Sequence, residues 1–340
     1  MARRLPKVTI AIPTFNRLRY LRQAIGSALA QSYPELEVIV SDNNSDDGTA
    51  EALESISDPR LIFLRQSRNL GMIGNWNACL ERATGELFLL LSDDDYLEQK
   101  AIERLVEAIV NAPESDTVGV AYCRTWVVGP DNNKLGLGSV PCLSEEALDF
   151  ALGYFEGHRA LYPASTMMRT EDLRSVGGYA QGSVTLAADA MAFSRVLLKR
   201  GVIAGVPDAL AYYRQHPASV TSTTSISTWQ TDIKELIALW SAGFGKCSAG
   251  RRKRFLHAAK KYESSQIAMN INRSVISWRS GIRLIASYWT CRDSFIGIVG
   301  IRNCLVGMMT LIAPEFLKRP VRTSLLLLQE KGTDRLLIGK

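Results

Sequence analysis

The sequence contains neither of the two glycine-rich loops that most often hold nucleotide phosphates. No G-x-G-x-x-G stretch follows the first expected strand, and no G-x-x-x-x-G-K-[ST] stretch occurs anywhere in the 340 residues. Dinucleotide binding and P-loop hydrolysis therefore lose their main support, because both depend on backbone N–H groups that such loops present to phosphate. If the protein binds a nucleotide, a metal ion and side chains must hold the phosphates.

Cysteine patterns and a leader segment are also missing. The six cysteines form no C-x-x-C pair and have no metal-type spacing, so we expect reduced thiols in a cytosolic protein. The N-terminus shows no signal peptide, because the apolar run after Arg3 and Arg4 is short and is broken at Pro13.

Positive charge is scarce in the first two thirds of the chain and concentrated in the last third. The net charge of the whole chain is +6, but residues 223–340 contain 19 Lys and Arg against 7 Asp and Glu. A basic C-terminal region can bind anionic lipid or nucleic acid. The acidic remainder argues against nucleic acid as a substrate, and we expect no nucleic-acid partner.

The most informative stretch of the sequence is an apolar run followed closely by three consecutive carboxylates. Residues 87–91 form the run, and Asp93, Asp94 and Asp95 follow after a single serine. A buried strand cannot carry adjacent acids at its end without a counter-charge. Oxygen ligands on a short loop suit Mg²⁺ or Mn²⁺, which share their coordination with substrate phosphates. Taken alone, the stretch also fits a solvated turn that caps the next helix.

Strand and helix patterns alternate four times over the first 110 residues. This alternation predicts a parallel sheet covered by helices on both faces, with a ligand site at the carboxyl ends of the strands. The expected strands are 8–13, 36–41, 61–64 and 87–91, and the expected helices are 18–29, 49–56, 75–82 and 101–110. Further along, we expect strands at 118–128 and 165–169 and helices at 144–155, 229–240 and 253–271.

Four motifs, in this order and spacing, resemble family 2 glycosyltransferases. They are 13–17 (PTFNR), 41–49 (SDNNSDDGT), 69–71 (NLG) and 92–95 (SDDD). The resemblance continues through 177–179, 188–189 and 213–219, and covers about residues 5–222. It implies an α/β fold of the GT-A (Rossmann-like) type, a mostly parallel sheet flanked by helices. The donor-binding half would be about 5–115 and the acceptor-binding half about 116–222, followed by a basic helical C-terminal extension, 223–340.

The resemblance implies a metal-dependent, inverting glycosyltransferase of the hexosyltransferase type. It would move a single sugar from a UDP- or dTDP-sugar to a glycan or lipid-linked acceptor in bacterial surface polysaccharide biosynthesis. Asp189 matches the general base, and Asp94 and His216 match residues that hold Mn²⁺ or Mg²⁺. The expected nucleotide-sugar-binding residues are Pro13, Thr14, Phe15, Arg17, Asp42, Asn69, Asp93, Asp94 and Asp95.

Each role has a structural alternative that the sequence leaves open. Asp42 also fits an Asx turn, His216 a surface turn, and Asp189 a helix N-cap. Arg17 can contact the donor, or it can pair with Asp46 or Asp47.

Two positions depart from the family pattern. Ser92 stands where the family commonly has an acid, and Ala188 stands where it commonly has a glutamate before the base. The absence of a neighbouring carboxylate removes one repulsive contribution that would raise the pKa of Asp189. These departures keep open the alternative of a non-catalytic sugar-nucleotide-binding protein. A nucleotidyltransferase, which shares an α/β sheet and a metal, is a second alternative, but it would need a basic, glycine-rich loop after the first strand, and residues 14–17 do not form one.

The C-terminal region contains one candidate membrane segment. Residues 295–313 are long enough to span, but Arg302 and Asn303 lie near the centre and make spanning marginal. A packed helical hairpin, or a segment in the membrane interface beside the basic residues 251–254, accommodates the charge better. We therefore expect a cytoplasmic protein, with peripheral binding to an anionic membrane surface as one interpretation. No Q-x-x-R-W motif is present, which argues against a processive synthase.

Overall fold

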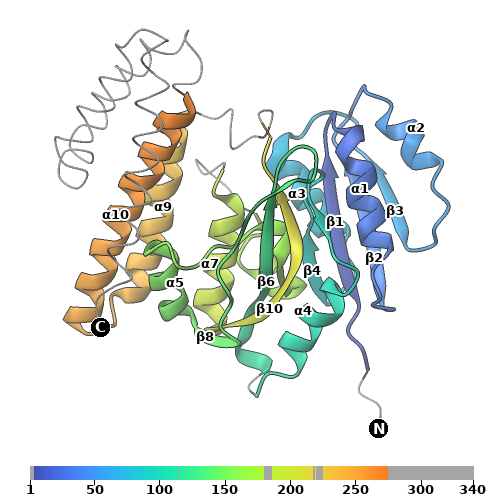
Figure 1. Cartoon of the computed structure of the whole chain (residues 1–340). Helices are drawn as coiled ribbons and strands as arrows, with labels where there is room; N and C mark the ends of the chain where they lie inside the picture. The colour runs from blue at the N-terminus through green and yellow to red at the C-terminus, as the bar shows by residue number, and fades with distance from the viewer. Residues whose placement is uncertain (1–3, 114, 180–185, 217–218, 220–224, 275–340) are drawn as a thin grey trace, which may run out of the picture. The chain divides into compact units, whose positions relative to one another are not determined.

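The computed structural model describes residues 4–113, 115–179, 186–216, 219 and 225–274. Residues Met1–Tyr262 form one compact unit, and the described part of the second unit, Glu263–Lys340, is the end of one helix. The first unit is built around a ten-stranded sheet with helices on both faces (Figure 1). The predicted α/β class and GT-A architecture are confirmed.

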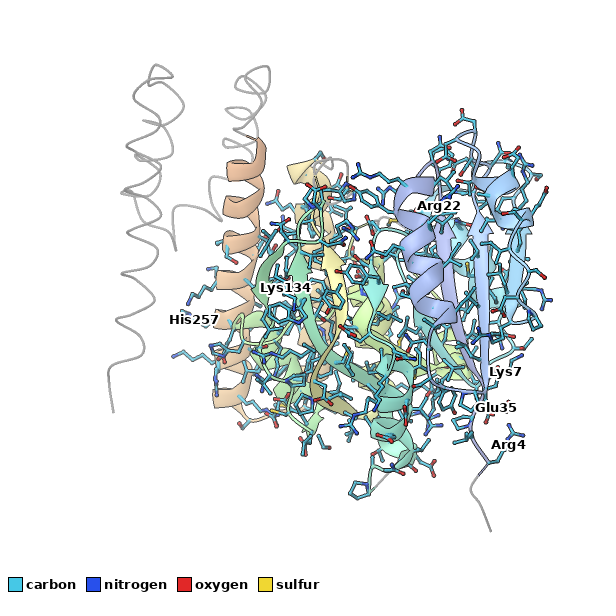
Figure 2. The ribbon with its side chains drawn as sticks, turned by 45° about the vertical axis from the view of Figure 1, so that its right-hand side comes forward. Arg4, Lys7, Arg22, Glu35, Lys134 and His257 are labelled. Carbon is cyan, nitrogen blue, oxygen red and sulfur yellow. The ribbon has the colours of Figure 1, made fainter. Side chains whose placement is uncertain are left out.

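The first half of the sheet is parallel, in the order β3-β2-β1-β4. β1 and β2 are buried along their whole length because helices cover both of their faces, which explains their continuous apolar pattern. Figure 2 shows Lys7 and Glu35, which precede these two strands, at the same end of the sheet. The elements are β1 Val8–Thr14, α1 Leu18–Leu29, β2 Leu36–Asp42, α2 Thr49–Glu54, β3 Leu61–Arg65, α3 Gly71–Arg82 and β4 Leu87–Leu90.

The second half of the sheet is mixed. β9 runs antiparallel between β4 and β6, whereas β10 runs parallel to β6. The mostly parallel arrangement therefore holds for the first half alone. The elements are β5 Tyr96–Leu97, α4 Ala101–Val110, β6 Val118–Val128, β7 Lys134–Leu137, β8 Ser144–Glu146, α5 Ala147–Phe155, β9 Thr166–Arg169, α6 Thr170–Ser175, α7 Ala188–Arg200, β10 Val202–Arg214, α9 Ile226–Phe244 and α10 Ala249–Ser274.

One expected helix is shorter than predicted. The apolar periodicity indicated a helix over 144–155, but residues 144–146 form β8 and the helix α5 begins at Ala147. β8 pairs with the start of β10, where Val202 lies opposite Glu146. Strand pairing with a segment 56 residues away in the sequence overrides the local helical pattern, and this is information that a single-sequence pattern does not contain.

Two hydrophobic cores lie on opposite faces of the sheet. β1 contributes Ile10 and Ile12 to one core and Ala11 to the other, as the alternation of a strand requires. Trp240 on α9 and Phe255 on α10 belong to the second core, together with residues of α5 and α7. The compact unit therefore continues past residue 222, and the division of function at 222 stays a prediction.

The candidate membrane segment 295–313 lies outside the described residues. Within the part of the chain that is described, no helix combines the length and apolar character needed to cross a bilayer. The helices expected at 229–240 and 253–271 lie inside α9 and α10.

Candidate functional site

The candidate site lies where the chain order along the sheet reverses. β2 and β3 extend the sheet on one side of β1, and β4 lies on the other side. Ligands of doubly wound α/β proteins bind at such a switch point, outside the carboxyl ends of the strands. The register places Thr14 at the end of β1 beside Asp42 at the end of β2.

The acidic loop, defined as Asp93 to Asp95, follows β4 and is held against the end of β1. The hydroxyl of Thr14 donates to Oδ2 of Asp93 at 2.8 Å. Nη1 of Arg17 donates to Oδ1 of Asp93 at 3.2 Å and to Oδ2 of Asp94 at 2.8 Å. The three aspartates are only 5%, 8% and 1% exposed. The solvated-turn interpretation of this loop is therefore wrong.

His216 joins the acidic loop from the far end of the chain. Its Nε2 lies 2.9 Å from Oδ2 of Asp94, and its ring packs against Tyr20 at a centroid distance of 5.2 Å. Its side chain is 4% exposed, so the surface-turn interpretation is also wrong. The structure thus brings together two of the residues expected to bind metal.

Arg214 is a buried residue whose role the sequence analysis did not assign. Its Nε donates to the carbonyl oxygen of Asp94 at 2.7 Å, and its backbone N–H donates to Oδ1 of Asp95 at 2.8 Å. Its Nη2 donates to Gln23 at 2.8 Å, and the guanidinium lies over the ring of Tyr20. Arg214 therefore locks the backbone of the acidic loop. A charged residue that ends a buried strand two positions before His216 was the available signal.

The electrostatics of the acidic loop favour an additional cation. Burial and the charge of Asp94 raise the pKa of Asp93 to about 6, although Arg17 and Thr14 act in the opposite direction. Burial and the charge of Asp94 also raise the pKa of Asp95 well above its ordinary value. Oδ2 of Asp95 is buried without a hydrogen-bond partner. Ionising all the carboxylates is therefore costly until positive charge arrives.

The donor set suits Mn²⁺ or Mg²⁺ only if a ligand completes it. Asp94 and His216 lie close enough to share one ion, and a carboxylate is a ligand that suits Mg²⁺ and Mn²⁺. Among the described residues, no group of three or more His, Cys, Asp or Glu side chains could hold an ion. An ion here would take its remaining ligands from a diphosphate and water, as these metals commonly do.

Asp42 presents one paired and one unpaired oxygen. Its side chain is fully buried, and Oδ1 accepts a hydrogen bond from the backbone N–H of Ser45 at 3.0 Å. Oδ2 is buried without a hydrogen-bond partner. The Asx-turn alternative therefore accounts for one oxygen and leaves the other open to a donor from outside the protein.

The other residues expected around the donor surround Asp42. Phe15 is 42% exposed and Pro13 is buried in β1. Asn69 is exposed, and its Oδ1 accepts from Nδ2 of Asn43 at 2.8 Å, which joins the loop after β3 to the loop after β2. The aromatic ring of Phe15 and the unpaired oxygen of Asp42 thus lie at neighbouring strand ends.

Asp189 lies in the first turn of α7 and not at its N-cap. The N-cap residue is Ala187, and Oδ1 of Asp189 accepts the N–H of Ala190 at 2.7 Å. Asp232 of α9 instead receives the N–H groups of Leu186 and Ala187, at 2.6 and 3.0 Å. The N-cap interpretation of Asp189 is therefore wrong, because a residue 43 positions away holds the helix start.

The environment of Asp189 makes it a weak acid. Burial raises its pKa to about 6, with a smaller contribution from the charge of Asp232, while the N–H of Ala190 opposes the shift. Tyr154, Tyr179 and Tyr262 are close enough to Asp189 for its charge to raise their own pKa values, after burial as the larger cause.

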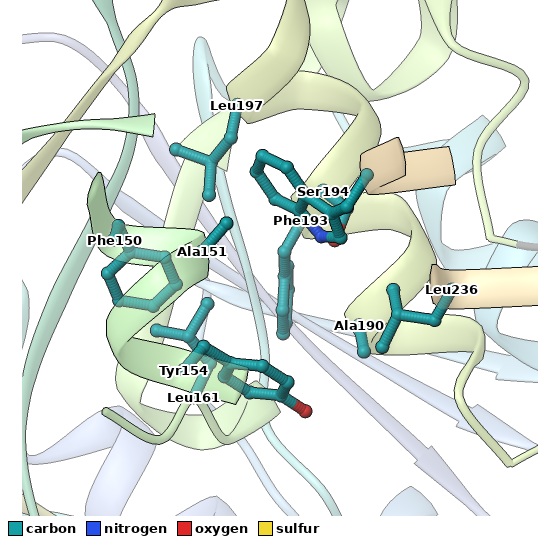
Figure 3. Close-up of a pocket in the computed structure, with 10 residues that line it drawn as sticks. Phe150, Ala151, Tyr154, Leu161, Ala190, Phe193, Ser194, Leu197 and Leu236 are labelled. Carbon is teal, nitrogen blue, oxygen red and sulfur yellow. The ribbon is translucent and has the colours of Figure 1, made fainter. Parts of the chain in front are cut away.

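Ala190, the residue after Asp189, lines an apolar pocket. Figure 3 shows the pocket between side chains of α5, α7 and α9, with Ala190 and the Tyr154 hydroxyl on its rim. Tyr162 stacks on Tyr213 and is close enough to Asp95 for that carboxylate to raise its pKa, again after burial. The charge of Tyr162 also contributes to the raised pKa of Tyr154, after burial and Tyr262.

The sheet order, the carboxylates at its strand ends and the histidine beside them match the GT-A architecture. The model of the family described as Glycosyl transferase family 2 matches residues 9–170, which is a little under half of the chain. This region therefore has the sequence of a glycosyl transferase family 2 domain.

Similar curated proteins are glycosyltransferases from bacteria. Over 106 residues the chain is 40% identical to the GalNAc(5)-diNAcBac-PP-undecaprenol beta-1,3-glucosyltransferase of Campylobacter jejuni, covering 30% of this chain and 34% of that protein. Over 235 residues it is 28% identical to an uncharacterized glycosyltransferase of Nostoc, covering 67% of this chain and 70% of that protein. The match to the Campylobacter protein thus spans about a third of that protein's length.

Solved structures share the fold at low sequence identity. S. aureus TarS residues 1–349 with UDP-GlcNAc superposes with a TM-score of 0.55 at 17% identity, covering 79% of this chain and 86% of that chain. A mannosyltransferase of Pyrobaculum calidifontis with GDP-Man and Mn²⁺ gives 0.52 at 18% identity, covering 84% of this chain and 80% of that chain. At such identities the likeness establishes the fold alone.

Proposed function

We propose that the protein transfers a single sugar, with inversion, from a UDP- or dTDP-sugar to a glycan or lipid-linked acceptor in bacterial surface polysaccharide biosynthesis. The observation that carries the proposal is the unpaired Oδ2 of the fully buried Asp42. The imide N–H of uracil or thymine satisfies this oxygen, while the exposed ring of Phe15 covers the base. Cytosine and adenine lack this N–H and leave a buried acid unpaired, which favours uracil and thymine over these two bases.

The diphosphate of the donor would lie over the acidic loop. Asp94 and His216 would hold Mn²⁺ or Mg²⁺ together with the phosphate oxygens. The bound ion would neutralise the charge that develops on the diphosphate leaving group. Thr14 and Arg214 hold Asp93 and the backbone of the loop in position for this contact.

Asp189 would act as the general base. A carboxylate with a pKa near 6 is ionised at neutral pH and is more basic than an ordinary aspartate, which suits removal of a proton from an acceptor hydroxyl. The deprotonated hydroxyl attacks the anomeric carbon opposite the diphosphate, and the C–O bond to the leaving group breaks. The configuration at that carbon is inverted as a consequence. Ala188 supplies no second carboxylate, so burial raises the pKa of Asp189, with a smaller contribution from the charge of Asp232.

Titration calorimetry tests donor and metal binding together. UDP, dTDP and CDP are titrated into the wild type with and without Mn²⁺, and into Asp94→Ala. Asp46→Ala is a matched control, because Asp46 is an exposed aspartate of the loop after β2. We expect Asp94→Ala to lose metal-dependent binding and Asp46→Ala to keep it, and we expect CDP to bind more weakly than UDP or dTDP.

Binding that is indifferent to Mn²⁺ and to Asp94→Ala contradicts the proposal. Donor binding without transfer to any acceptor supports the alternative of a non-catalytic sugar-nucleotide-binding protein. Release of pyrophosphate from a nucleoside triphosphate would instead identify a nucleotidyltransferase.

We also propose that the outer face of α10 binds an anionic membrane surface, on the cytoplasmic side of the inner membrane. Phe255 and Ala258 face the core, and Arg254 pairs at 2.8 Å with Glu156, the residue after α5, which fixes the orientation of the helix. His257 points away from the sheet in Figure 2. The outward-facing, exposed residues of α10 are Arg252, Lys253, Leu256, His257, Lys260 and Lys261.

The composition of this face suits the lipid interface. Several cations surround one exposed leucine, Leu256, so that electrostatic attraction to anionic headgroups is combined with an apolar contact. In a sedimentation assay with vesicles, the double variant Lys253→Glu with Lys260→Glu should lose binding to phosphatidylglycerol. Arg22→Glu, an exposed arginine of α1, is the matched control. Equal binding to neutral vesicles, or no effect of the double variant, contradicts this proposal.

A further inference from the structure

The acidic loop already contacts a cation that the protein itself supplies. Nη1 of Arg17 lies 2.8 Å from Oδ2 of Asp94 and 3.2 Å from Oδ1 of Asp93. The same Oδ2 of Asp94 lies 2.9 Å from Nε2 of His216. The oxygen that a metal ion would share with His216 is therefore engaged by the guanidinium group.

The backbone on both sides of Arg17 is anchored, whereas its side chain is partly exposed to solvent. Asn16 has a φ of 54° and donates its N–H to the Ser45 hydroxyl at 2.9 Å. The N–H of Leu18 donates to Asp47 at 2.9 Å. The Arg17 side chain is 24% exposed. The guanidinium can therefore leave the acidic loop by rotation of its own side chain, without a rearrangement of the loop after β1.

The charges around the loop explain when this departure is favourable. Arg17 contacts two of the three carboxylates, and Arg214 reaches the loop through the Asp94 carbonyl and its own N–H. A divalent ion neutralises the buried carboxylates of the acidic loop better than the single charge of Arg17 does. Its binding would, however, separate the displaced guanidinium from Asp93 and Asp94. A diphosphate that arrives with the ion provides a new partner, because guanidinium and phosphate pair well.

We propose that Arg17 is an exchangeable counter-ion, which neutralises the acidic loop in the free enzyme and moves to the diphosphate when metal and donor bind together. The inference rests on the proposed function, because it assumes a diphosphate ligand at this loop. It assigns Arg17 a positioning role that couples the two binding events. Metal ion alone must compete with Arg17, whereas metal ion with nucleotide does not.

Removing the Arg17 guanidinium removes its competition with the metal ion. In Arg17→Met, the carboxylates lose their resident cation and a divalent ion meets no positive charge at Asp94. Mn²⁺ alone should then bind about tenfold more tightly or better than to the wild type, since charge-assisted hydrogen bonds of this kind contribute roughly this factor. Mn²⁺ in the presence of UDP should gain nothing, because Arg17 no longer holds the diphosphate. The coupling between Mn²⁺ and UDP should shrink accordingly.

The experiment measures Mn²⁺ dissociation constants by electron paramagnetic resonance, with and without UDP, for the wild type, Arg17→Met, Arg17→Lys and Arg22→Met. Arg22 is an exposed arginine of α1, the helix that begins directly after Arg17, and Figure 2 shows it on that helix. We expect strong coupling in the wild type and in Arg22→Met, weak coupling in Arg17→Met, and an intermediate value in Arg17→Lys. Thermal melting checks that each variant is folded.

Equal Mn²⁺ affinities of wild type and Arg17→Met in the absence of UDP overturn the inference. If Arg17→Met does not fold, Arg17→Lys decides, and an unchanged coupling in that variant overturns it as well. A wild type that binds no UDP with Mn²⁺ present contradicts the proposed function instead, so the two failures are distinguishable.

Discussion

Buried carboxylates at the two ends of the same sheet differ in how completely they are hydrogen-bonded. Near the start of β2, Glu37 is 4% exposed and fully surrounded by donors. Nζ of Lys7 lies 2.6 Å from its Oε2, and the N–H of Thr84 donates to its Oε1 at 2.7 Å. Burial by itself would raise the pKa of Glu37, but the hydrogen bonds from Lys7, Thr84 and Thr9 outweigh it and lower the pKa to about 2.

At the carboxyl end of the strands the carboxylates are equally buried and incompletely paired. Asp42 and Asp95 each have one oxygen without a hydrogen-bond partner, and burial raises the pKa values of Asp93 and Asp95. Buried polar atoms are almost always satisfied in native proteins. Burial therefore does not separate Glu37 from Asp42 and Asp95, whereas the completeness of their hydrogen bonding does.

The largest expected effect concerns Asp189, the proposed general base. Asp189→Asn should lower the rate of sugar transfer by at least about a thousandfold, because an amide cannot accept the proton of the acceptor hydroxyl. Donor affinity should remain within about threefold of the wild type, because Asp189 has no place in the proposed donor contacts. Transfer rates and calorimetric donor affinities for both proteins measure this. A rate loss below tenfold would remove Asp189 from the mechanism.

A pair of matched substitutions tests the comparison itself. Glu37→Gln should lower the free energy of unfolding by about 2–4 kcal/mol, because it breaks a satisfied buried ion pair, and should leave UDP affinity unchanged. Asp42→Asn should weaken UDP binding by about 10- to 100-fold, because an amide N–H₂ group can face the imide N–H, and should change stability by less than about 1 kcal/mol.

Denaturant unfolding and UDP calorimetry on both variants provide the two readouts. The wild type at the same pH and salt concentration is the reference. If both variants lose stability and neither loses affinity, the two ends of the sheet do not differ as described.

The smallest expected effect is the pH dependence of stability. The folded pKa of Asp189 is raised from 3.8 to about 6, so the native state binds this proton more tightly than the unfolded state. This contribution is fully present below about pH 4 and is lost as the pH rises to about 6, with a size of roughly 1–3 kcal/mol. Glu37 has the opposite sign, because its contribution is lost as the pH falls from 4.5 to about 2.

Denaturant unfolding of the wild type and Asp189→Asn between pH 4 and pH 7 isolates the Asp189 contribution. The variant should become relatively more stable as the pH rises. Parallel stability curves would show that the folded pKa of Asp189 is close to that of an ordinary aspartate. Transfer activity of the wild type should fall as the pH drops below about 6 for the same reason.

Local patterns were sufficient wherever one segment determines its own structure. The apolar runs and helical periods located β1, α1, β2, β4 and α4 to within a residue or two, because period and burial follow directly from the order of side chains. β8 was mistaken for the start of a helix, because its strand pairing depends on β10.

The same distinction between local pattern and long-range contact applies to the candidate site. The sequence by itself determined which residue types stand at the strand ends, since the motifs around Asp42, Asp94 and His216 are local in the chain. Only the tertiary structure decided that Arg17 contacts Asp93 and Asp94, and that Arg214 holds the backbone of the acidic loop. Asp94 and Arg214 are 120 residues apart, and contacts over such separations follow from how the strands are ordered in the sheet. The order of strands is a property of the packed molecule, which no short stretch of the chain carries.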